Sequence, residues 1–135
     1  MISTKGRYAI RFMIDLAEQL EGCAVPLSET AQRQEISKKY LESVVKLLVA
    51  AKLVKGSGGK GGGYRLVRRP EEYTAWEILT ATEGTLASVA CLAGNAAPCP
   101  RMKKCKTLPM WKKFDAAVYG FFSGITLADL VRGDI

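Results

Sequence analysis

The sequence predicts a mainly α-helical fold with a small β wing, in which a winged helix-turn-helix domain precedes a long C-terminal dimerisation helix. Apolar residues recur at helical spacing in several segments. A run of glycines lies between two short strand-like segments, and a bulky apolar stripe follows residue 109. We expect the winged-helix domain over residues 1–84, a cysteine-containing loop over residues 85–108, and the long helix with a short final helix over residues 109–135.

Apolar periodicity and capping residues predict the first three helices. A helix over residues 5–20 carries one apolar face, made of Ala9, Phe12, Met13, Leu16, Ala17 and Leu20. Ser28 is expected to cap a short helix that ends near Gln34, because a serine hydroxyl accepts hydrogen bonds from the first amides of a helix. Ser37 is expected to cap a longer helix, to about Lys52, in the same way.

This longer helix has two chemically different faces. Its expected inward face is apolar and consists of Leu41, Val44, Val45 and Leu48. Its N-terminal and outer positions are polar or charged and consist of Ser37, Lys38, Lys39, Tyr40, Glu42, Ser43 and Lys46. A short helix, a tight turn and a helix with such an outer face are typical of a DNA-binding helix-turn-helix. A helical hairpin in an ordinary small bundle is the alternative.

A glycine-tipped hairpin follows, with strands expected at residues 53–55 and 64–67. The bare backbone of its tip can approach phosphates or enter a minor groove closely. Its candidate DNA contacts are Lys55, Lys60 and Arg65. A dinucleotide-binding loop is disfavoured because no helix follows the glycines, and a phosphate-binding loop because the required Ser or Thr is missing. A flexible loop without function is the remaining alternative.

The formal net charge is +7, and its distribution points to a polyanionic partner. Residues 36–70 contain nine Lys or Arg and one acid, a local charge of +8, and residues 99–113 contain six Lys or Arg and no acid. Double-stranded DNA is the expected partner, and a solvated basic face is the alternative. The absence of histidine excludes His-based acid–base catalysis. We therefore expect neither an enzyme nor a small-molecule substrate.

The last long helix is expected to mediate a homodimer. Its apolar stripe consists of Trp111, Phe114, Val118, Phe122 and Ile125. Packing on the chain's own core is the alternative, but the body available to cover this stripe is small. A two-fold dimer also suits a two-fold DNA site. Thr126 is expected to cap a short final helix over residues 126–132.

Three of the four cysteines are clustered. Cys91, Cys99 and Cys105 follow the pattern C-x7-C-x5-C, whereas Cys23 stands apart and is expected to be a small buried apolar residue. No stretch predicts a membrane span or a secretory signal, so we expect a cytoplasmic protein with reduced thiols. Thiols in such a loop can bind a metal or cluster, and nearby cations stabilise thiolates. Three unpaired structural cysteines are the alternative.

With these residues in place, the sequence resembles the Rrf-type family of winged-helix iron–sulfur transcription regulators (IscR-, NsrR- and RirA-like proteins) over nearly the whole chain. The resemblance rests on residues 3–11, 36–42 and 61–64, the three clustered cysteines, Trp111, and residues 125–131. It implies a homodimer whose long helices cross-pack. It also implies that Cys91, Cys99 and Cys105 ligate a 2Fe–2S or 4Fe–4S cluster that controls operator affinity.

The sequence departs from the family pattern in two features, the fourth ligand and the wing. Leu108 stands where IscR-like members have a ligand histidine, and Arg7 stands where some nitric-oxide sensors have an acidic ligand. The fourth ligand is therefore open among Asp15, Glu18, Cys23, a small thiol and water. Gly58 replaces an arginine of the wing found in many relatives, which leaves Lys55 and Lys60 as the expected wing contacts.

The leading hypothesis is a DNA-binding regulator, expected to be a repressor, that senses iron, cluster or redox status. The first alternative is a regulator of the same fold that senses nitric oxide or thiol oxidation. The second alternative, from another class, is a metal or iron–sulfur enzyme or carrier with no role at DNA.

Overall fold

Within residues 2–94 and 96–135, the computed structural model contains six α-helices, two short 3₁₀ helices and two β-strands. In chain order these are α1 (Thr4–Glu18), α2 (Leu27–Gln34), α3 (Lys38–Ala50), β1 (Val54–Ser57), β2 (Gly63–Leu66), η1 (Pro70–Glu72), α4 (Ala75–Glu83), η2 (Ala90–Leu92), α5 (Leu108–Ser123) and α6 (Leu127–Arg132). The predicted mainly helical fold with a small β wing is confirmed. None of these helices has the length and apolar character needed to cross a membrane.

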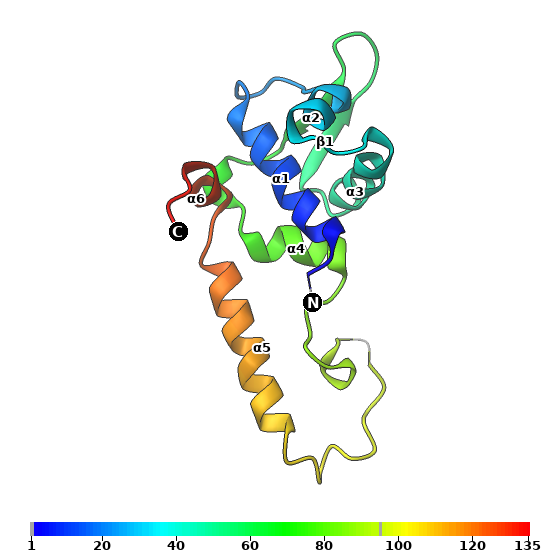
Figure 1. Ribbon diagram of the computed structural model, residues 1–135, viewed down its shortest axis with the longest axis vertical. Helices are drawn as coiled ribbons and strands as arrows, with labels where there is room; N and C mark the ends of the chain where they lie inside the picture. The colour runs from blue at the N-terminus through cyan, green and yellow to red at the C-terminus, as the bar shows by residue number, and fades with distance from the viewer. Residues whose placement is uncertain (1, 95) are drawn as a thin grey trace.

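The elements form a body from which one helix projects. Figure 1 shows α1 to α4, the two strands and α6 gathered in this body, while α5 extends along the long axis of the molecule. The loop that precedes α5 lies at the end of this axis opposite the wing (Figure 1). The expected helix-turn-helix and the part of this loop next to α5 therefore lie far apart within one chain.

A short turn joins the two helices of the helix-turn-helix. Glu35 follows α2 with a left-handed φ of 55°, which turns the chain toward α3. Ser37 caps α3 as predicted, since its side-chain oxygen accepts a hydrogen bond from the Tyr40 amide at 3.4 Å. The prediction that Ser28 caps α2 is wrong: α2 begins at Leu27, two residues earlier than predicted, and Pro26, whose ring fixes φ, occupies the cap position.

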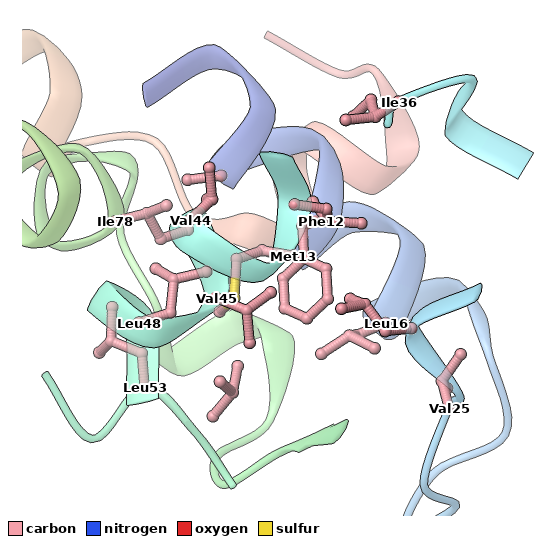
Figure 2. Packing of buried hydrophobic residues seen from close by; sticks show 14 of the residues in the cluster. Phe12, Met13, Leu16, Val25, Ile36, Val44, Val45, Leu48, Leu53 and Ile78 are labelled. Atoms are coloured by element: carbon pink, nitrogen blue, oxygen red, sulfur yellow. The ribbon is translucent and has the colours of Figure 1, made fainter. Parts of the chain in front are cut away.

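The core forms between α1, α3 and α4 (Figure 2). Its best-buried members on these helices are at most 1% exposed: Ala9, Phe12, Met13, Leu41, Val44, Val45, Leu48 and Ile78. Burial of a large apolar side chain contributes roughly 1.5–3 kcal/mol to stability. The inward face predicted for α3 is confirmed, and its burial leaves the opposite face of the helix toward solvent.

A buried ion pair joins α1 to α2. Asp15 is 1% exposed, and its two carboxylate oxygens accept hydrogen bonds from Arg33 at 2.9 and 2.8 Å. The Thr30 hydroxyl donates to the same carboxylate at 2.8 Å. Burial alone would raise the pKa of Asp15, but the hydrogen bonds from Arg33, Thr30 and Gln34 outweigh it and hold the pKa below its usual value. This two-pronged contact fixes the orientation of α2 against α1.

The wing is a two-stranded antiparallel hairpin that is also paired to the body. Val54 faces Leu66 and Lys55 faces Arg65 in the register of β1 and β2. Tyr64 exchanges two backbone hydrogen bonds with Val25, of 2.8 and 2.9 Å. A Cβ atom at Gly63 would collide with the carbonyl group of Val25, so this close approach requires glycine.

After α5 the chain returns to the body. The Ile125 carbonyl accepts a hydrogen bond from the Ala75 amide at 2.9 Å, and the Leu127 amide donates to the Tyr73 carbonyl at 3.0 Å. Leu127 is fully buried, and Thr126 begins α6 with a capping box as its sequence predicts. Residues 125–128 therefore complete the body, although they follow α5 in sequence.

Candidate nucleic-acid interface and cysteine loop

The outer face of α3 borders a cleft of about 580 Å³ beside the wing. Five predicted DNA contacts on α3 are exposed and line this cleft: Lys38, Lys39, Glu42, Ser43 and Lys46. Leu27 and the wing residue Tyr64 also line it. The arrangement places three ammonium groups, a hydroxyl and one carboxylate on one helix face. Such a face offers donors and acceptors to base edges and cations to phosphates.

Three of the predicted α3 contacts also have partners inside the protein. The Ser37 side chain is used in the helix cap, and the Ser43 hydroxyl donates to the Tyr40 carbonyl at 2.6 Å. The Tyr40 ring lies edge-on to the ring of Tyr8 with centroids 5.4 Å apart, and it remains 37% exposed. Tyr40 therefore links the start of α3 to α1 while part of its ring stays accessible.

The wing places like charges side by side. Lys55 and Arg65 are direct cross-strand neighbours, and both are exposed. Lys60 is exposed near the tip, where Gly59 and Gly61 adopt φ values near +80°. Within residues 2–94 and 96–135, neither Lys55 nor Arg65 takes part in an ion pair. Like charges opposite each other destabilise a hairpin, and such a local conflict is typical of a surface that binds an anion.

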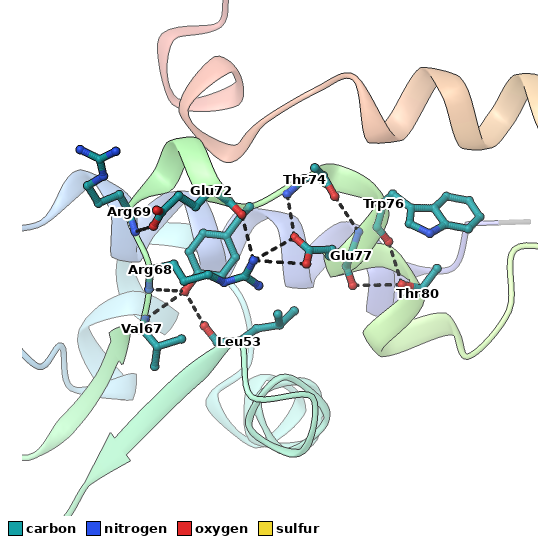
Figure 3. A network of polar contacts seen from close by, with 10 residues as sticks. Leu53, Val67, Arg68, Arg69, Glu72, Thr74, Trp76, Glu77 and Thr80 are labelled. Atoms are coloured by element: carbon teal, nitrogen blue, oxygen red, sulfur yellow. Dashed lines mark hydrogen bonds and ion pairs between the residues drawn. The ribbon is translucent and has the colours of Figure 1, made fainter.

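Tyr73 fixes the base of the wing, and its partners Leu53, Val67 and Arg68 are labelled in Figure 3. Its ring is fully buried, and its hydroxyl donates to the Leu53 carbonyl at 2.7 Å. The same oxygen accepts hydrogen bonds from the amides of Val67 and Arg68 at 2.9 and 3.1 Å. One side chain thus joins the segments that flank β1 and β2. Sequence patterns do not reveal this role of Tyr73, because its partners lie up to 20 positions away.

The three clustered cysteines lie on the loop between α4 and α5, and all are half-buried free thiols. Cys91 is part of η2, whereas Cys99 and Cys105 lie outside regular structure. Cys23 is also free but exposed, so the expectation that it is buried is wrong. It lies after the end of α1, on the rim of a cleft that Leu20 and Arg65 also line, outside the apolar core.

Hydrogen bonding favours the thiolate form of Cys105. A hydrogen bond between its sulfur and the Thr107 side chain, 3.3 Å long, is the main cause that lowers the pKa of Cys105, with backbone amides and Arg101 contributing. Thiolate is the form that ligates iron. Among the described residues, no group of three or more Cys, Asp or Glu side chains is close enough to hold a metal ion. The donor chemistry fits a cluster, but the three thiols are not gathered around one point.

Comparison with known proteins identifies the family. A family model described as Rrf2, iron-dependent transcriptional regulator, matches residues 2–133. The chain belongs to the Rrf2 family. The protein rrf2 of Nitratidesulfovibrio vulgaris is 35% identical to it over 131 residues, covering 97% of this chain and 87% of that protein. The HTH-type transcriptional regulator IscR of Aliivibrio salmonicida is 32% identical over 130 residues, covering 96% and 76% of the two chains.

Solved structures of Rrf2-type regulators are similar along the whole chain. The structure of CymR, the global cysteine regulator of B. subtilis, has a TM-score of 0.78 and 33% identity, covering 100% of this chain and 98% of that one. An oxidised form of Staphylococcus aureus CymR has a TM-score of 0.72 and 31% identity, covering 97% and 95%. This Rrf2-family chain is a DNA-binding transcriptional regulator and not an enzyme.

One side chain that the sequence offered as a fourth ligand already has a partner in the fold of this Rrf2-family chain. Asp15 is buried in its ion pair with Arg33, and Leu108 is 8% exposed at the start of α5. Asp115 is the single acid between residues 84 and 128, and its Oδ1 accepts a hydrogen bond from the Ser88 amide at 3.0 Å. Asp115 was not among the residues predicted for the site, although a single acid among many cations is a signal visible in the sequence.

One face of α5 in this Rrf2-family chain is apolar and exposed. Met110, Phe114 and Phe121 recur along it and are 42–60% exposed. Of the predicted stripe, Phe114 is exposed, while the other members are half-buried: Trp111, Val118, Phe122 and Ile125. Phe121 and Phe122 also line a cleft of about 440 Å³ against α1, α4 and the C-terminus. Exposed aromatic rings on this scale are typical of a protein interface.

Proposed function

We propose that this chain represses transcription as a homodimer that binds operator DNA with α3 and the wing, and that an iron–sulfur cluster on Cys91, Cys99 and Cys105 controls its affinity. The observation that carries the DNA surface is the Lys55–Arg65 pair beside the cationic face of α3. Two cations held opposite each other without a carboxylate partner are stabilised when a phosphate lies between them.

Within this proposal, α3 enters the major groove. Lys38, Lys39, Tyr40 and Ser43 face base edges, and Glu42 accepts a hydrogen bond from cytosine. Ser37 sets the start of the helix, and Lys46 binds a phosphate at its far side. Lys55, Lys60 and Arg65 hold phosphates or enter the minor groove, where negative potential is enhanced.

The homodimer is supported by the exposed apolar face of α5. A second copy of the chain would cover Met110, Phe114 and Phe121 and bring two copies of α3 to the two halves of an operator. Because α3 lies in the body and the last part of the loop before α5 lies at the far end of the long axis of one chain (Figure 1), a crossed dimer is a means to bring them together. The proposal therefore links regulation to dimerisation.

The cluster is supported by the resemblance to iron–sulfur regulators and by the thiol chemistry of the loop. Cys91, Cys99 and Cys105 would hold a 2Fe–2S or 4Fe–4S cluster, which supplies reversible redox and ligand-exchange chemistry. The exposed cations Arg101, Lys103, Lys104 and Lys106 would offset the negative charge of the bound thiolates. A cytoplasmic location, where thiols stay reduced, is part of the proposal.

The proposal is tested by combining anaerobic spectroscopy with DNA binding. Protein reconstituted anaerobically with iron and sulfide is expected to show visible absorbance that Cys91→Ala removes and Cys23→Ala retains. A duplex enriched by in vitro selection is expected to bind with an affinity that falls steeply with salt and that differs between cluster-bound and cluster-free protein. Wild-type protein that stays colourless after reconstitution refutes the proposed cluster. A DNA affinity that does not change with salt concentration refutes the proposed DNA-binding surface.

Thiol oxidation without a cluster is the second candidate. The free thiols, the lowered pKa of Cys105 and the similarity to a structure of CymR in an oxidised form favour it. It predicts a reversible bond among Cys91, Cys99 and Cys105 after mild peroxide treatment. Mass spectrometry that detects three free thiols after this treatment rules the second candidate out.

A further inference from the structure

Asp115 on α5 forms a contact that reaches back along the chain. It is the single carboxylate in residues 84–128, a region that carries six Lys or Arg within residues 99–113. Its Oδ1 accepts the hydrogen bond from the Ser88 amide at 3.0 Å, across 27 sequence positions. Because Ser88 lies three residues before Cys91, this bond attaches the Cys91 end of the loop to α5.

Helix α4 contacts α5 at Tyr119, four residues after Asp115. The rings of Trp76 and Tyr119 meet edge-on with centroids 4.9 Å apart. A cleft of about 240 Å³ lies at this junction of α4, the loop and α5, and Asp115 is the charged side chain among its lining residues. Leu86, which is 4% exposed, anchors the start of the loop there. The segment before Cys91 is therefore fixed to two helices.

The other end of the loop is attached differently. The hydrogen bonds described for residues 96–106, which include Cys99 and Cys105, all stay within residues 93–108. Nothing in the described structure thus ties these two thiols to α1–α4 by a hydrogen bond. Cys91 therefore follows a segment that is attached to α4 and α5. Cys99 and Cys105 lie on a segment whose described hydrogen bonds are internal to the loop.

We propose that Asp115 is a positioning residue for the iron–sulfur cluster: its carboxylate holds the Cys91 end of the loop against α5, and Cys99 and Cys105 close onto this fixed thiol. The inference rests on the proposed function. It adds a route for the signal, because closure of the loop pulls on α5 through the bond between Ser88 and Asp115. Cluster binding would then act on the proposed dimer helix through this hydrogen bond.

The contact requires an acceptor oxygen at position 115. The Asp115 carboxylate supplies one, and at 3.0 Å the bond has the length of an ordinary amide hydrogen bond, which a side-chain amide oxygen can also accept. The Ser88 hydroxyl takes no part in it, since this oxygen is buried and lacks a hydrogen-bond partner in the part of the chain that the structure describes. Ser88→Ala is therefore a matched control that keeps the amide donor and removes only the hydroxyl.

Two measurements on the full-length protein test the inference. Amide hydrogen exchange at Ser88 in cluster-free protein reports the clamp itself, and the rate of cluster loss to an iron chelator reports its effect on the cluster. Asp115→Ala is expected to raise both rates roughly 10-fold. Asp115→Asn, whose amide oxygen can still accept the bond, and Ser88→Ala are both expected to remain within about threefold of wild type.

The outcomes separate three cases. Unchanged Ser88 exchange in Asp115→Ala overturns the clamp. Asp115→Asn that protects Ser88 but loses its cluster as fast as Asp115→Ala, with an altered visible circular dichroism spectrum, overturns the positioning role in favour of direct ligation. Wild-type protein that takes up no cluster refutes the proposed function and with it the coupling, while the exchange data still decide whether the clamp exists.

Discussion

Replacing Lys55 by alanine removes one of the two like charges that face each other across the wing. Relief of a cross-strand like-charge pair is worth roughly 0.2–1 kcal/mol, and we expect the lower half of this range because both side chains are exposed to solvent. The free energy of unfolding of Lys55→Ala should therefore rise slightly. Its DNA affinity should fall, because each phosphate contact contributes about 0.9 to the slope of log K against log salt concentration.

A dimer carries two copies of Lys55, so this slope should become shallower by about 1.8 in the variant. Fluorescence anisotropy over a salt series measures the slope, and urea unfolding measures the stability. Lys55→Arg is the matched control, because it keeps the charge and should leave both quantities near wild type. A variant that loses stability, or one that keeps the full salt slope, would refute the assignment of this pair to the phosphate backbone.

Three further predictions concern the body and the dimer helix. Gly63→Ala should destabilise the fold by roughly 1–3 kcal/mol in urea unfolding, because its Cβ meets the Val25 carbonyl; an unchanged midpoint would contradict the tight pairing. The pKa of Asp15 is lower in the folded than in the unfolded state. The contribution of its ionised form to the free energy of unfolding is therefore complete above about pH 4 and is lost as the pH falls through the folded-state pKa. Asp15→Asn should cost roughly 1–2 kcal/mol at pH 7, because the neutral amide loses the charge-assisted bonds while the Arg33 side chain, which is 39% exposed, remains hydrated, and should flatten the stability profile below pH 4; equal acid sensitivity of variant and wild type would refute this. Phe121→Glu should yield monomers in sedimentation at concentrations where wild type is dimeric, and an unaltered dimer would exclude this face.

The helices and the wing could be predicted because their signals are local. Leu41, Val44, Val45 and Leu48 repeat at helical spacing, and the glycines at the wing tip separate two short extended segments. These patterns depend on neighbours within a few positions. The fold class, the cap at Ser37 and the inward face of α3 follow from them and are confirmed.

The features that could not be predicted depend on distant partners. Tyr73 looks like any aromatic residue until the fold brings Leu53 and Val67 to its hydroxyl. Cysteine is a residue type that is often buried, but Cys23 lies beyond the end of α1, outside the core. The DNA contacts and the three ligand cysteines stay predictions, since they depend on partners that a single chain does not contain. The sequence shows where the charges and thiols are, and in the proposed function their joint action depends on a second chain.

The return of the chain after α5 has a consequence for how the protein can be divided. Leu127 fills the core of the DNA-binding body, and its amide is bonded to Tyr73, yet it lies beyond the helix proposed to join the two subunits. A fragment that stops at residue 84 would expose the site that Leu127 covers and lose a buried leucine, worth roughly 2–5 kcal/mol. One end of α5 is thus connected to the thiol loop, and the other end is connected to the folded body. Proteolytic removal of the last ten residues would take Leu127 out of the core and should destabilise the body by a similar amount.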